Sequence, residues 1–315
     1  MESSARENST FSKLRSGGIL ARPLDMKRIC PVLFPPYNAE MPRSISFQGC
    51  SLSFGERGSG EPVVFIQGVG LHGEGWRPQT DVLHAAYRCV SFDNRGMGAS
   101  QPFAGKLTLE QMAKDTLAVM DAAEIASAHL VGHSLGGCIA QQVALGSPSR
   151  VKSLALLCTS ARGADATSLR WPMFLVGLRC HVGTAAMRRR AFLEIVMSRE
   201  YRATHDADKT AAELAPLFGH DLAKSPPGVM KQLGALKTFD ARARLTELAK
   251  FPVLVLSAEE DIIFPPRCGR VLAQGVAGAR YVEIAKAAHG VPMEHAERVN
   301  RELESHLRTA TAGQR

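Results

Sequence analysis

The sequence lacks any long hydrophobic run. Its most apolar stretches, such as residues 172–178, end within about ten residues, whereas a helix that crosses a membrane needs about 20. The first thirty residues are polar and mixed in charge, without the apolar core of a secretory signal. We therefore expect no membrane span and no export by that route.

Paired cysteines are missing as well. The seven cysteines are an odd number, widely spaced, and no two of them form a C-x-x-C pair. This spacing argues against a disulfide framework and against a zinc ribbon. Several cysteines lie in apolar stretches, among them Cys89 and Cys158, where a free thiol behaves as a small hydrophobic side chain. The pattern predicts a reducing, cytoplasmic location and no bound metal.

Clustered positive charge is scarce, although the net charge is high. The chain carries 38 basic and 30 acidic residues, a formal charge of +8 that attracts anionic partners. The one dense basic run, residues 188–190, has no interleaved aromatic residue and belongs to no recognisable nucleic-acid module. We interpret it as a solvated helix face and predict no nucleic-acid partner.

The order of apolar patterns indicates an α/β protein of 315 residues. Residues 1–42 are rich in Ser, Arg, Gly and Pro, show no periodicity, and are predicted to be a flexible N-terminal arm. From residue 44 onward a predicted hairpin is followed by short apolar runs typical of strands buried on both faces, at 63–66, 89–92, 129–131, 154–158, 253–256 and 281–284. Helical patterns separate these runs, the clearest at 108–122, where Thr108 and Gln111 match a capping box. The alternation predicts a mostly parallel, doubly wound sheet flanked by helices.

Residues 162–240 interrupt this alternation. They contain no convincing strand but several helical patterns, at 169–179, 185–199 and 229–238. We predict a helical cap, or lid, inserted between two parts of the core, 43–161 and 241–315. The cap is expected to roof a substrate pocket, and the candidates for substrate contact are Trp171, Phe174 and Phe192.

The segment Gly132-His133-Ser134-Leu135-Gly136 matches G-x-S-x-G. It directly follows a predicted buried strand and directly precedes a predicted helix, which is the setting of a nucleophile elbow. Small residues at 132 and 136 allow neighbouring backbone to approach and leave the serine hydroxyl exposed above the sheet. Ser134 is therefore the candidate nucleophile, and His133 is predicted to be a packing residue that points away from it.

A serine hydroxyl is a poor nucleophile near neutral pH and needs a histidine within hydrogen-bond reach. His289 is the best candidate among ten histidines, because it follows the predicted strand 281–284 and precedes the final helix, predicted over 291–307. His295, within that helix, is the alternative base.

The histidine in turn needs a carboxylate to orient it. Glu259, Glu260 and Asp261 lie together at the end of the predicted strand 253–256. Asp261 is favoured because the apolar residues after it hold it inward, and Glu260 is the alternative.

Backbone N–H groups near the elbow can stabilise an oxyanion. The N–H of Leu135 follows the nucleophile directly, and the N–H of Val69 lies in a glycine-rich loop after the predicted strand 63–66. That loop also matches G-x-G-x-x-G, with Asp93 about twenty residues further on, a spacing known from dinucleotide sites. The stretch 73–78 is a poor start for the long helix such a site requires, so we expect no cofactor.

The segment 92–100, F-D-N-R-G-M-G-A-S, follows another predicted strand. We expect Asp93 and Arg95 to pair within this turn, while Gly96 and Gly98 take backbone conformations denied to other residues. No chemistry is assigned to it.

With these motifs the chain resembles the α/β-hydrolase superfamily, in its cap-bearing branch of esterases, lactonases, cofactor-free haloperoxidases and carbon–carbon bond hydrolases. The resemblance covers about residues 45–307 and is carried by F-D-N-R-G-M-G-A-S, G-H-S-L-G-G, P-V-L-V-L-S before Asp261, and A-H-G. It implies that Ser134 is the nucleophile, His289 the base and Asp261 the orienting acid. The N–H groups of Leu135 and Val69 are the implied oxyanion donors. Gln67 departs from the family, where a histidine is common.

The resemblance implies a serine hydrolase that cleaves a small-molecule carboxylic ester or lactone through an acyl-enzyme intermediate, without a cofactor. Its substrate is expected to be of medium size and hydrophobic. A carbon–carbon bond hydrolase, a haloperoxidase-like enzyme and a noncatalytic ligand receptor are the alternatives that the same fold allows.

Overall fold

The computed structural model describes residues 43–103, 105–167 and 171–313, without side-chain detail at 167 and 171–174. The predicted arm, residues 1–42, lies outside this part of the chain. Within it, eight strands form one sheet in the order β1-β2-β4-β3-β5-β6-β7-β8. The strands are β1 (Arg43–Phe47), β2 (Cys50–Arg57), β3 (Glu61–Ile66), β4 (Tyr87–Phe92), β5 (Ala128–His133), β6 (Val151–Leu157), β7 (Val253–Ala258) and β8 (Arg280–Ile284).

The sheet is parallel except at one edge. β1 and β2 form the predicted hairpin, which turns at Gln48 and Gly49, both with positive φ, of 46° and 74°. β2 also pairs antiparallel with β4, and every other pairing is parallel. All residues of β5 and β7 are buried, which explains why their sequences show no polar alternation. The predicted doubly wound α/β fold is confirmed.

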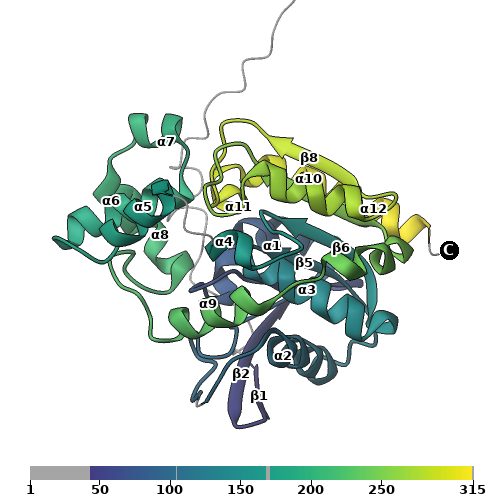
Figure 1. Cartoon of the computed structure of the whole chain (residues 1–315). Helices are drawn as coiled ribbons and strands as arrows, with labels where there is room; N and C mark the ends of the chain where they lie inside the picture. Colours follow the sequence, from purple (N-terminus) through teal and green to yellow (C-terminus); the bar gives the residue numbers. More distant parts are fainter. Residues whose placement is uncertain (1–42, 104, 168–170, 314–315) are drawn as a thin grey trace, which may run out of the picture. The chain divides into compact units, whose positions relative to one another are not determined.

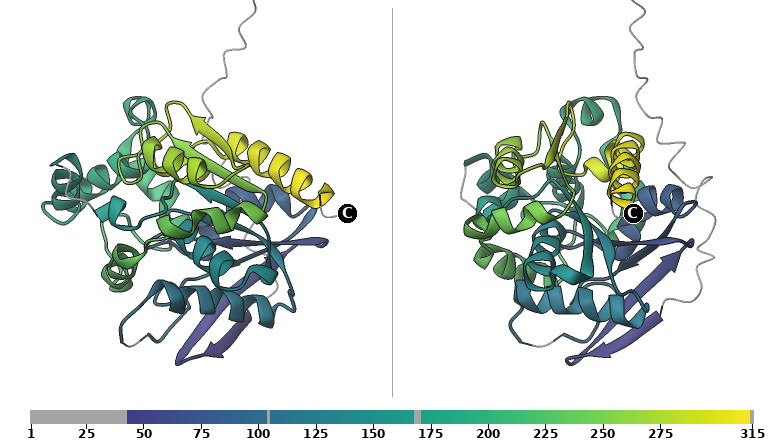
Figure 2. Two further views of the ribbon diagram at one scale, coloured as in Figure 1. Left: turned by 45° about the vertical axis from the view of Figure 1, so that its right-hand side comes forward. Right: turned by 90° about the vertical axis from the view of Figure 1, so that its right-hand side faces the viewer.

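Helices cover both faces of this sheet (Figures 1 and 2). One face packs against α1 (Arg77–Leu83), α11 (Val291–Glu294) and α12 (Ala296–Ala312). Leu303 and Leu307 of α12 pack in one cluster with strand residues such as Val131. The other face packs against α2 (Leu109–Ala122), α3 (Leu135–Gly146) and α10 (Pro266–Gly275). Short 3-10 helices occur at η2 (Gly73–Trp76), η3 (Pro148–Arg150) and η4 (Arg242–Lys250).

The start of α2 and the turn after β4 correct two details of the sequence analysis. Thr108 Oγ1 accepts from Gln111 N at 3.1 Å as expected, but the Gln111 side chain donates to Asp115 and does not close the capping box. The predicted pair between Asp93 and Arg95 is wrong, because the Arg95 guanidinium donates to Asp115 at 2.6 Å. Arg95 and Asp115 are both buried, and a buried guanidinium needs a buried carboxylate.

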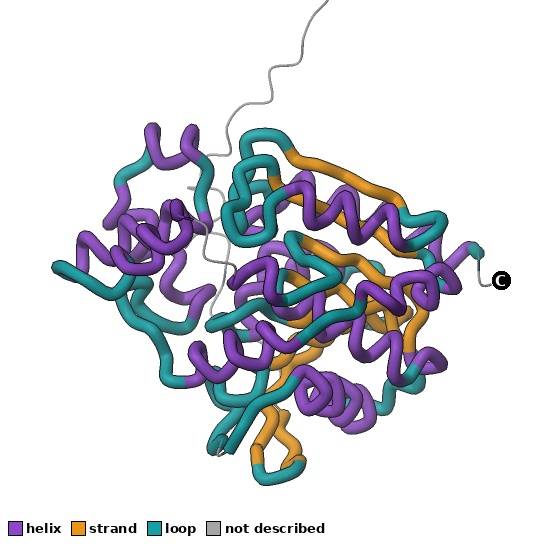
Figure 3. Tube along the Cα trace, in the orientation of Figure 1, coloured by secondary structure: helices purple, strands orange, loops and turns teal. Residues whose placement is uncertain are grey.

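Between β6 and β7 the chain is helical, as Figure 3 shows. The described residues of this stretch form α4 (Ala164–Thr167), α5 (Trp171–Arg179), α6 (Ala185–Val196), α7 (Arg199–Thr204), α8 (Ala207–Phe218) and α9 (Gly228–Thr238). Apolar side chains of α6 and α8, such as Leu193, Leu214 and Phe218, form a cluster with Leu71 and Met293, whereas Leu236 of α9 packs with the core beneath the sheet. The helical patterns at 169–179, 185–199 and 229–238 correspond to α5, α6 and α9. The division into core and cap stays a prediction.

Two helix ends differ from the predicted ones. Ser198 caps α7, because its Oγ accepts from Tyr201 N at 3.2 Å, and this separates α7 from α6. The final predicted helix is broken at His295, which lies between α11 and α12. No helix in the described ranges combines the length and apolar character needed to cross a membrane.

Two buried histidines, His129 on β5 and His306 on α12, make the fold sensitive to acid. Burial lowers the pKa of His129 to about 4 and that of His306 to about 4. Because these folded-state pKa values lie below the ordinary value of about 6.5, stability is complete above that pH and is lost as the pH falls toward 4. We expect each histidine to lower the free energy of unfolding by about 2 kcal/mol between about pH 7 and pH 5.

Urea unfolding at these two pH values tests this expectation. His306→Leu should lose less stability on acidification than the parent chain, by about 2 kcal/mol, because the variant no longer takes up that proton on unfolding. If parent and variant lost the same free energy of unfolding on acidification, His306 would already be charged at about pH 5 in the folded protein.

Candidate active site

Ser134 occupies a strained turn between β5 and α3. Its backbone has φ 56° and ψ −119°, a combination that few non-glycine residues adopt. The glycines on either side allow the turn to be this tight. A Cβ atom on Gly132 would lie 2.3 Å from the Gly136 carbonyl oxygen, and one on Gly136 would lie 2.0 Å from the Ile66 carbonyl oxygen. The turn therefore projects the serine side chain from the end of the strand.

The structure brings together the three side chains that the sequence analysis selected. His289 Nε2 lies 3.0 Å from Ser134 Oγ, and His289 Nδ1 lies 2.8 Å from Asp261 Oδ2. The three residues follow β5, β8 and β7, whose carboxyl ends share one edge of the sheet. A carboxylate only accepts hydrogen bonds, so His289 Nδ1 carries the proton and Nε2 is free to accept from the serine hydroxyl.

The carboxylate of Asp261 is enclosed by donors. Its Oδ1 accepts from the N–H groups of Ile263 at 2.8 Å and Phe264 at 3.0 Å, and its side chain is fully buried. Burial, together with the nearby charge of Asp261, raises the pKa of the Cys158 thiol well above its usual range. Glu260, the alternative acid, instead accepts from the backbone N–H of Arg199 at 2.8 Å.

The backbone of His289 is fixed from two directions. His133 Nε2 donates to the His289 carbonyl at 2.8 Å, and the His289 N–H donates to the carbonyl of Ile195, in α6, at 3.2 Å. Burial lowers the pKa of His133 to about 3, so its imidazole is neutral and keeps the proton on Nε2. His133 thus holds the loop of His289 in addition to packing against Trp76. His295, the alternative base, bonds to the Lys286 carbonyl.

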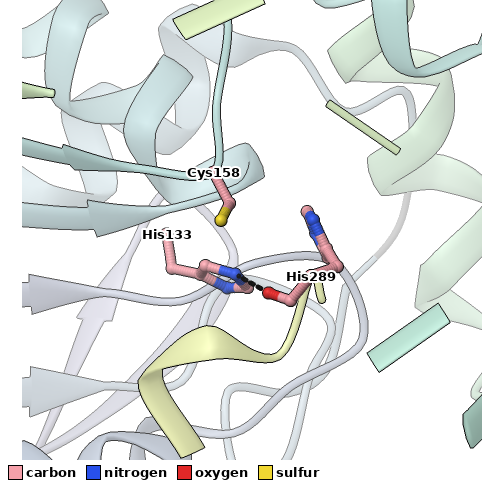
Figure 4. A group of neighbouring side chains, drawn as sticks. All are labelled: His133, Cys158 and His289. Carbon is pink, nitrogen blue, oxygen red and sulfur yellow. Dashed lines mark hydrogen bonds between the residues drawn. The ribbon is translucent and has the colours of Figure 1, made fainter. Parts of the chain in front are cut away.

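One group of possible metal ligands occurs among the residues that the structure describes. Figure 4 shows His133, Cys158 and His289, whose ligand atoms lie within 4.8 Å of one another. Both imidazoles are already engaged. His289 uses its two ring nitrogens in the contacts with Asp261 and Ser134, and His133 Nε2 donates to the His289 carbonyl. The cluster therefore fits a hydrogen-bonded network better than a metal centre.

The loop after β3 lies against the elbow. A Cβ atom on Gly68 would be 3.1 Å from Ser134 Cβ. In this loop Gly68 N–H donates to Gln67 Oε1 at 3.2 Å and Gly70 N–H donates to Gln232 Oε1 at 2.9 Å. The N–H of Val69, between them, has no acceptor among the described residues. The Leu135 N–H is the first of α3, where N–H groups have no acceptor within the helix.

The G-x-G-x-x-G pattern in this loop has a structural role. Its last glycine, Gly73, begins the short η2, and α1 then runs for only 7 residues. The Asp93 carboxylate, which a dinucleotide site would direct at a ribose, accepts from Gly73 N–H at 2.8 Å and from Ala99 N–H at 2.9 Å. These bonds join two loops of the protein.

Above these residues lies a cavity of about 390 Å³. Ser134, His289 and Val69 lie in its wall, but Leu135 is not among its lining residues. Phe192 also lines it, as expected for a substrate contact, whereas the side chains of Trp171 and Phe174 lie outside the described part. Most of the remaining wall is apolar. Its side chains come both from residues 162–240 and from the rest of the chain: Leu71, Trp76, Ile195, Val196, Phe218, Leu222, Val229, Leu233, Leu236, Ile263 and Met293.

The comparisons with known proteins agree with this geometry. The model of a family described as "alpha/beta hydrolase fold" matches residues 61–296. The chain belongs to the α/β-hydrolase family. It is a hydrolase of the esterase, lactonase and haloperoxidase-like branch, as the relatives below show.

Two sequence relatives and one solved structure illustrate the branch to which this α/β hydrolase belongs. The protein named "Putative non-heme bromoperoxidase BpoC" from Mycobacterium tuberculosis is 32% identical over 79% of this chain and 95% of its own. "Putative carbamate hydrolase RutD" from Azorhizobium caulinodans is 31% identical over 74% of this chain and 85% of its own. The enol-lactonase from Burkholderia xenovorans LB400 superimposes with a TM-score of 0.72 at 26% identity, covering 84% of this chain and 99% of the lactonase.

The contacts of this α/β hydrolase include residues that the sequence analysis did not select. Glu294, on α11, is one of them, since its buried carboxylate accepts from Ser198 N at 3.1 Å, from the Ser198 hydroxyl and from Ala288 N at 3.3 Å. Burial raises the pKa of Glu294. Gln232 on α9 is the other. Neither belongs to a local motif, so only the three-dimensional structure identifies them.

Proposed function

We propose that this α/β hydrolase is a serine hydrolase that cleaves a carboxylic ester or lactone through an acyl-enzyme intermediate. One observation carries the proposal. A continuous hydrogen-bonded relay runs from Ser134 through His289 to the buried Asp261. Its serine end opens on an apolar cavity. The names of two structural relatives, an enol-lactonase and a thermophilic esterase from Thermogutta terrifontis, agree with this reaction class.

The geometry suggests how the relay performs the first half of the reaction. Ser134 Oγ attacks the carbonyl carbon while its proton passes to His289 Nε2, and Asp261 holds the resulting imidazolium through Nδ1–H. The carbonyl oxygen becomes an oxyanion near the N–H groups of Val69 and Leu135. Each such donor lowers the barrier by about 3 kcal/mol.

The second half of the reaction reverses these proton transfers. The tetrahedral intermediate collapses as His289 protonates the leaving alcohol oxygen, which leaves the acyl group on Ser134. A water molecule, deprotonated by the same histidine, then attacks the acyl carbon. The bond between this carbon and Ser134 Oγ breaks as His289 Nε2 returns the proton to Oγ, and the acid is released. The residues supply every proton acceptor and donor that this cycle needs, so the proposal requires no cofactor.

The cavity supports a medium-sized, hydrophobic substrate. Its volume of about 390 Å³ suits a medium-sized ester or lactone, and its wall is mainly aliphatic and aromatic. Residues 162–240 act in this proposal as the cap, because α6, α8 and α9 provide much of the wall. Phe192 is its best-placed described candidate for substrate contact, packed edge-on against Phe218 with ring centroids 5.3 Å apart.

Labelling and hydrolysis together test the proposal. The protein should react with a fluorophosphonate at one serine and hydrolyse p-nitrophenyl esters. Turnover should rise from acetate to hexanoate or octanoate and fall at palmitate, because the longest chain exceeds the cavity. In Phe192→Ala we expect the optimum to move toward longer acyl chains, with about a tenfold gain in kcat/KM for the decanoate relative to the butyrate.

The matched control is Phe251→Ala, which removes a half-buried phenylalanine outside the cavity wall. It should leave the chain-length profile unchanged. If Phe192→Ala also left the profile unchanged, Phe192 would not contact the acyl chain. If the intact protein neither reacted with the fluorophosphonate nor hydrolysed esters, the proposed function itself would be overturned.

A further inference from the structure

We propose that Gln232 is a positioning residue for the oxyanion loop, the segment Gln67 to Gly70 after β3. By accepting the hydrogen bond of the Gly70 N–H, Gln232 fixes the direction of the neighbouring Val69 N–H and so completes the site that receives the substrate oxygen. The proposal rests on the serine-hydrolase function above and assigns a role to a residue 162 positions away in the chain.

The contact is buried and direct. Gln232 lies on α9, has no exposed surface, and its Oε1 accepts from Gly70 N at 2.9 Å. The helix also packs closely on the loop at this point. Gly70 has φ +79°, a conformation that favours glycine, and a Cβ atom there would make a tight contact of 3.2 Å with Val229 Cγ2 of α9.

Two N–H groups of the loop, on either side of Val69, donate to side-chain amides. Gly68 N–H donates to Gln67 Oε1 and Gly70 N–H donates to Gln232 Oε1, at 3.2 and 2.9 Å. Val69 N–H, between these two anchored peptides, has no acceptor in the ranges that the structure describes, and Val69 lies in the cavity wall. Because Val69 is half-buried and lines the cavity, this unpaired N–H is available to a bound ligand.

The Gly70 carbonyl is held from the same side. His220 Nε2 lies 3.2 Å from Gly70 O and donates to it in the tautomer with the proton on Nε2, while Nδ1 lies 2.9 Å from the Asp221 carbonyl. In that tautomer both the N–H and the C=O of Gly70 bond to side chains of the 162–240 segment. Glycine has little intrinsic preference for one backbone conformation, and a loop with glycines at 68 and 70 cannot fix an N–H direction by itself. The bonds from Gln232 and His220 provide the constraint that the loop sequence lacks.

Gln232→Met tests the proposal because it keeps the length of the side chain and removes the acceptor. Losing an oxyanion donor outright lowers kcat by about 10² to 10³-fold, and a misdirected donor should cause a smaller loss. We expect kcat for p-nitrophenyl esters to fall about 30-fold with KM changed less than about threefold. Affinity for a trifluoromethyl ketone, which forms an oxyanion on the serine, should fall in parallel with kcat/KM.

Two further variants separate positioning from folding. Gln232→Glu keeps an oxygen at the same place and should restore kcat to within about fivefold of the parent at a pH where the buried carboxyl is protonated. Asn300→Leu is the matched control. It removes a buried amide that donates to the Pro78 carbonyl at 2.9 Å, away from the cavity wall. Asn300→Leu should lose stability but keep kcat and the affinity for the ketone.

Each outcome decides the question. If Gln232→Met and the parent share the same kcat and ketone affinity per labelled serine, the positioning role is wrong, while the hydrolase function stands. Should Gln232→Met fail to fold, Gln232→Asn, which withdraws the acceptor by one methylene, must show the same parallel loss or the proposal fails. A parent protein that neither labels nor hydrolyses esters would instead overturn the proposed function.

Discussion

Ser134→Ala is expected to lower kcat for ester hydrolysis by about 10⁶-fold, to the level of residual binding and oxyanion effects. The variant lacks the only oxygen that His289 Nε2 contacts in the relay, at 3.0 Å, so no acyl-enzyme can form. Fluorophosphonate labelling should disappear together with turnover. The fold should persist, because alanine fits the small space of the hydroxyl and Ser134 N–H keeps its bond to the Leu157 carbonyl at 2.9 Å.

A second buried serine provides the control for this experiment. Ser153, on β6, also has its hydroxyl 2.8 Å from a histidine nitrogen, that of His129, but lies outside the cavity wall. Ser153→Ala should hydrolyse esters and take up the label like the parent. Equal turnover in Ser134→Ala and the parent would falsify the nucleophile assignment and leave another group to be found.

The placement of Ser134, His289 and Asp261 beside one another is predictable from sequence because its determinants are local. A glycine two positions before and after Ser134, next to a run of apolar residues, specifies the strand, the tight turn and the helix together. His289 and Asp261 were found for the same reason. Each follows a buried strand directly, and parallel strands bring their carboxyl ends to one edge of a sheet.

Interactions between distant segments were not accessible in this way. The local sequence predicts a pair between Arg95 and its near neighbour Asp93, whereas the buried partner of Arg95 is Asp115 on α2. The bond between Gln232 and Gly70 depends on how α9 docks on the loop, and no periodicity or motif encodes that docking. Local patterns specify elements, and side-chain partners are decided by which elements pack together.

Asp261→Asn is expected to lower kcat by about 10⁴-fold while the protein stays folded. The N–H groups of Ile263 and Phe264 both point at Oδ1, so the asparagine oxygen should take that position and its NH₂ group should face His289 Nδ1. A donor there forces the proton of the neutral imidazole onto Nε2. In this tautomer His289 donates toward Ser134 and cannot accept its proton.

The two neighbouring carboxylates Asp261 and Glu260 are expected to respond differently to amide substitution. Glu260→Gln removes the neighbouring charge but leaves Asp261 in contact with His289 at 2.8 Å, and its kcat should stay within about threefold of the parent. Steady-state kinetics of both variants at several pH values provides the measurement. If Glu260→Gln were the inactive variant and Asp261→Asn the active one, Glu260 would have to orient the histidine. For Asp261→Asn we expect kcat to fall while KM stays unchanged, because the defect lies in proton transfer and leaves substrate binding intact.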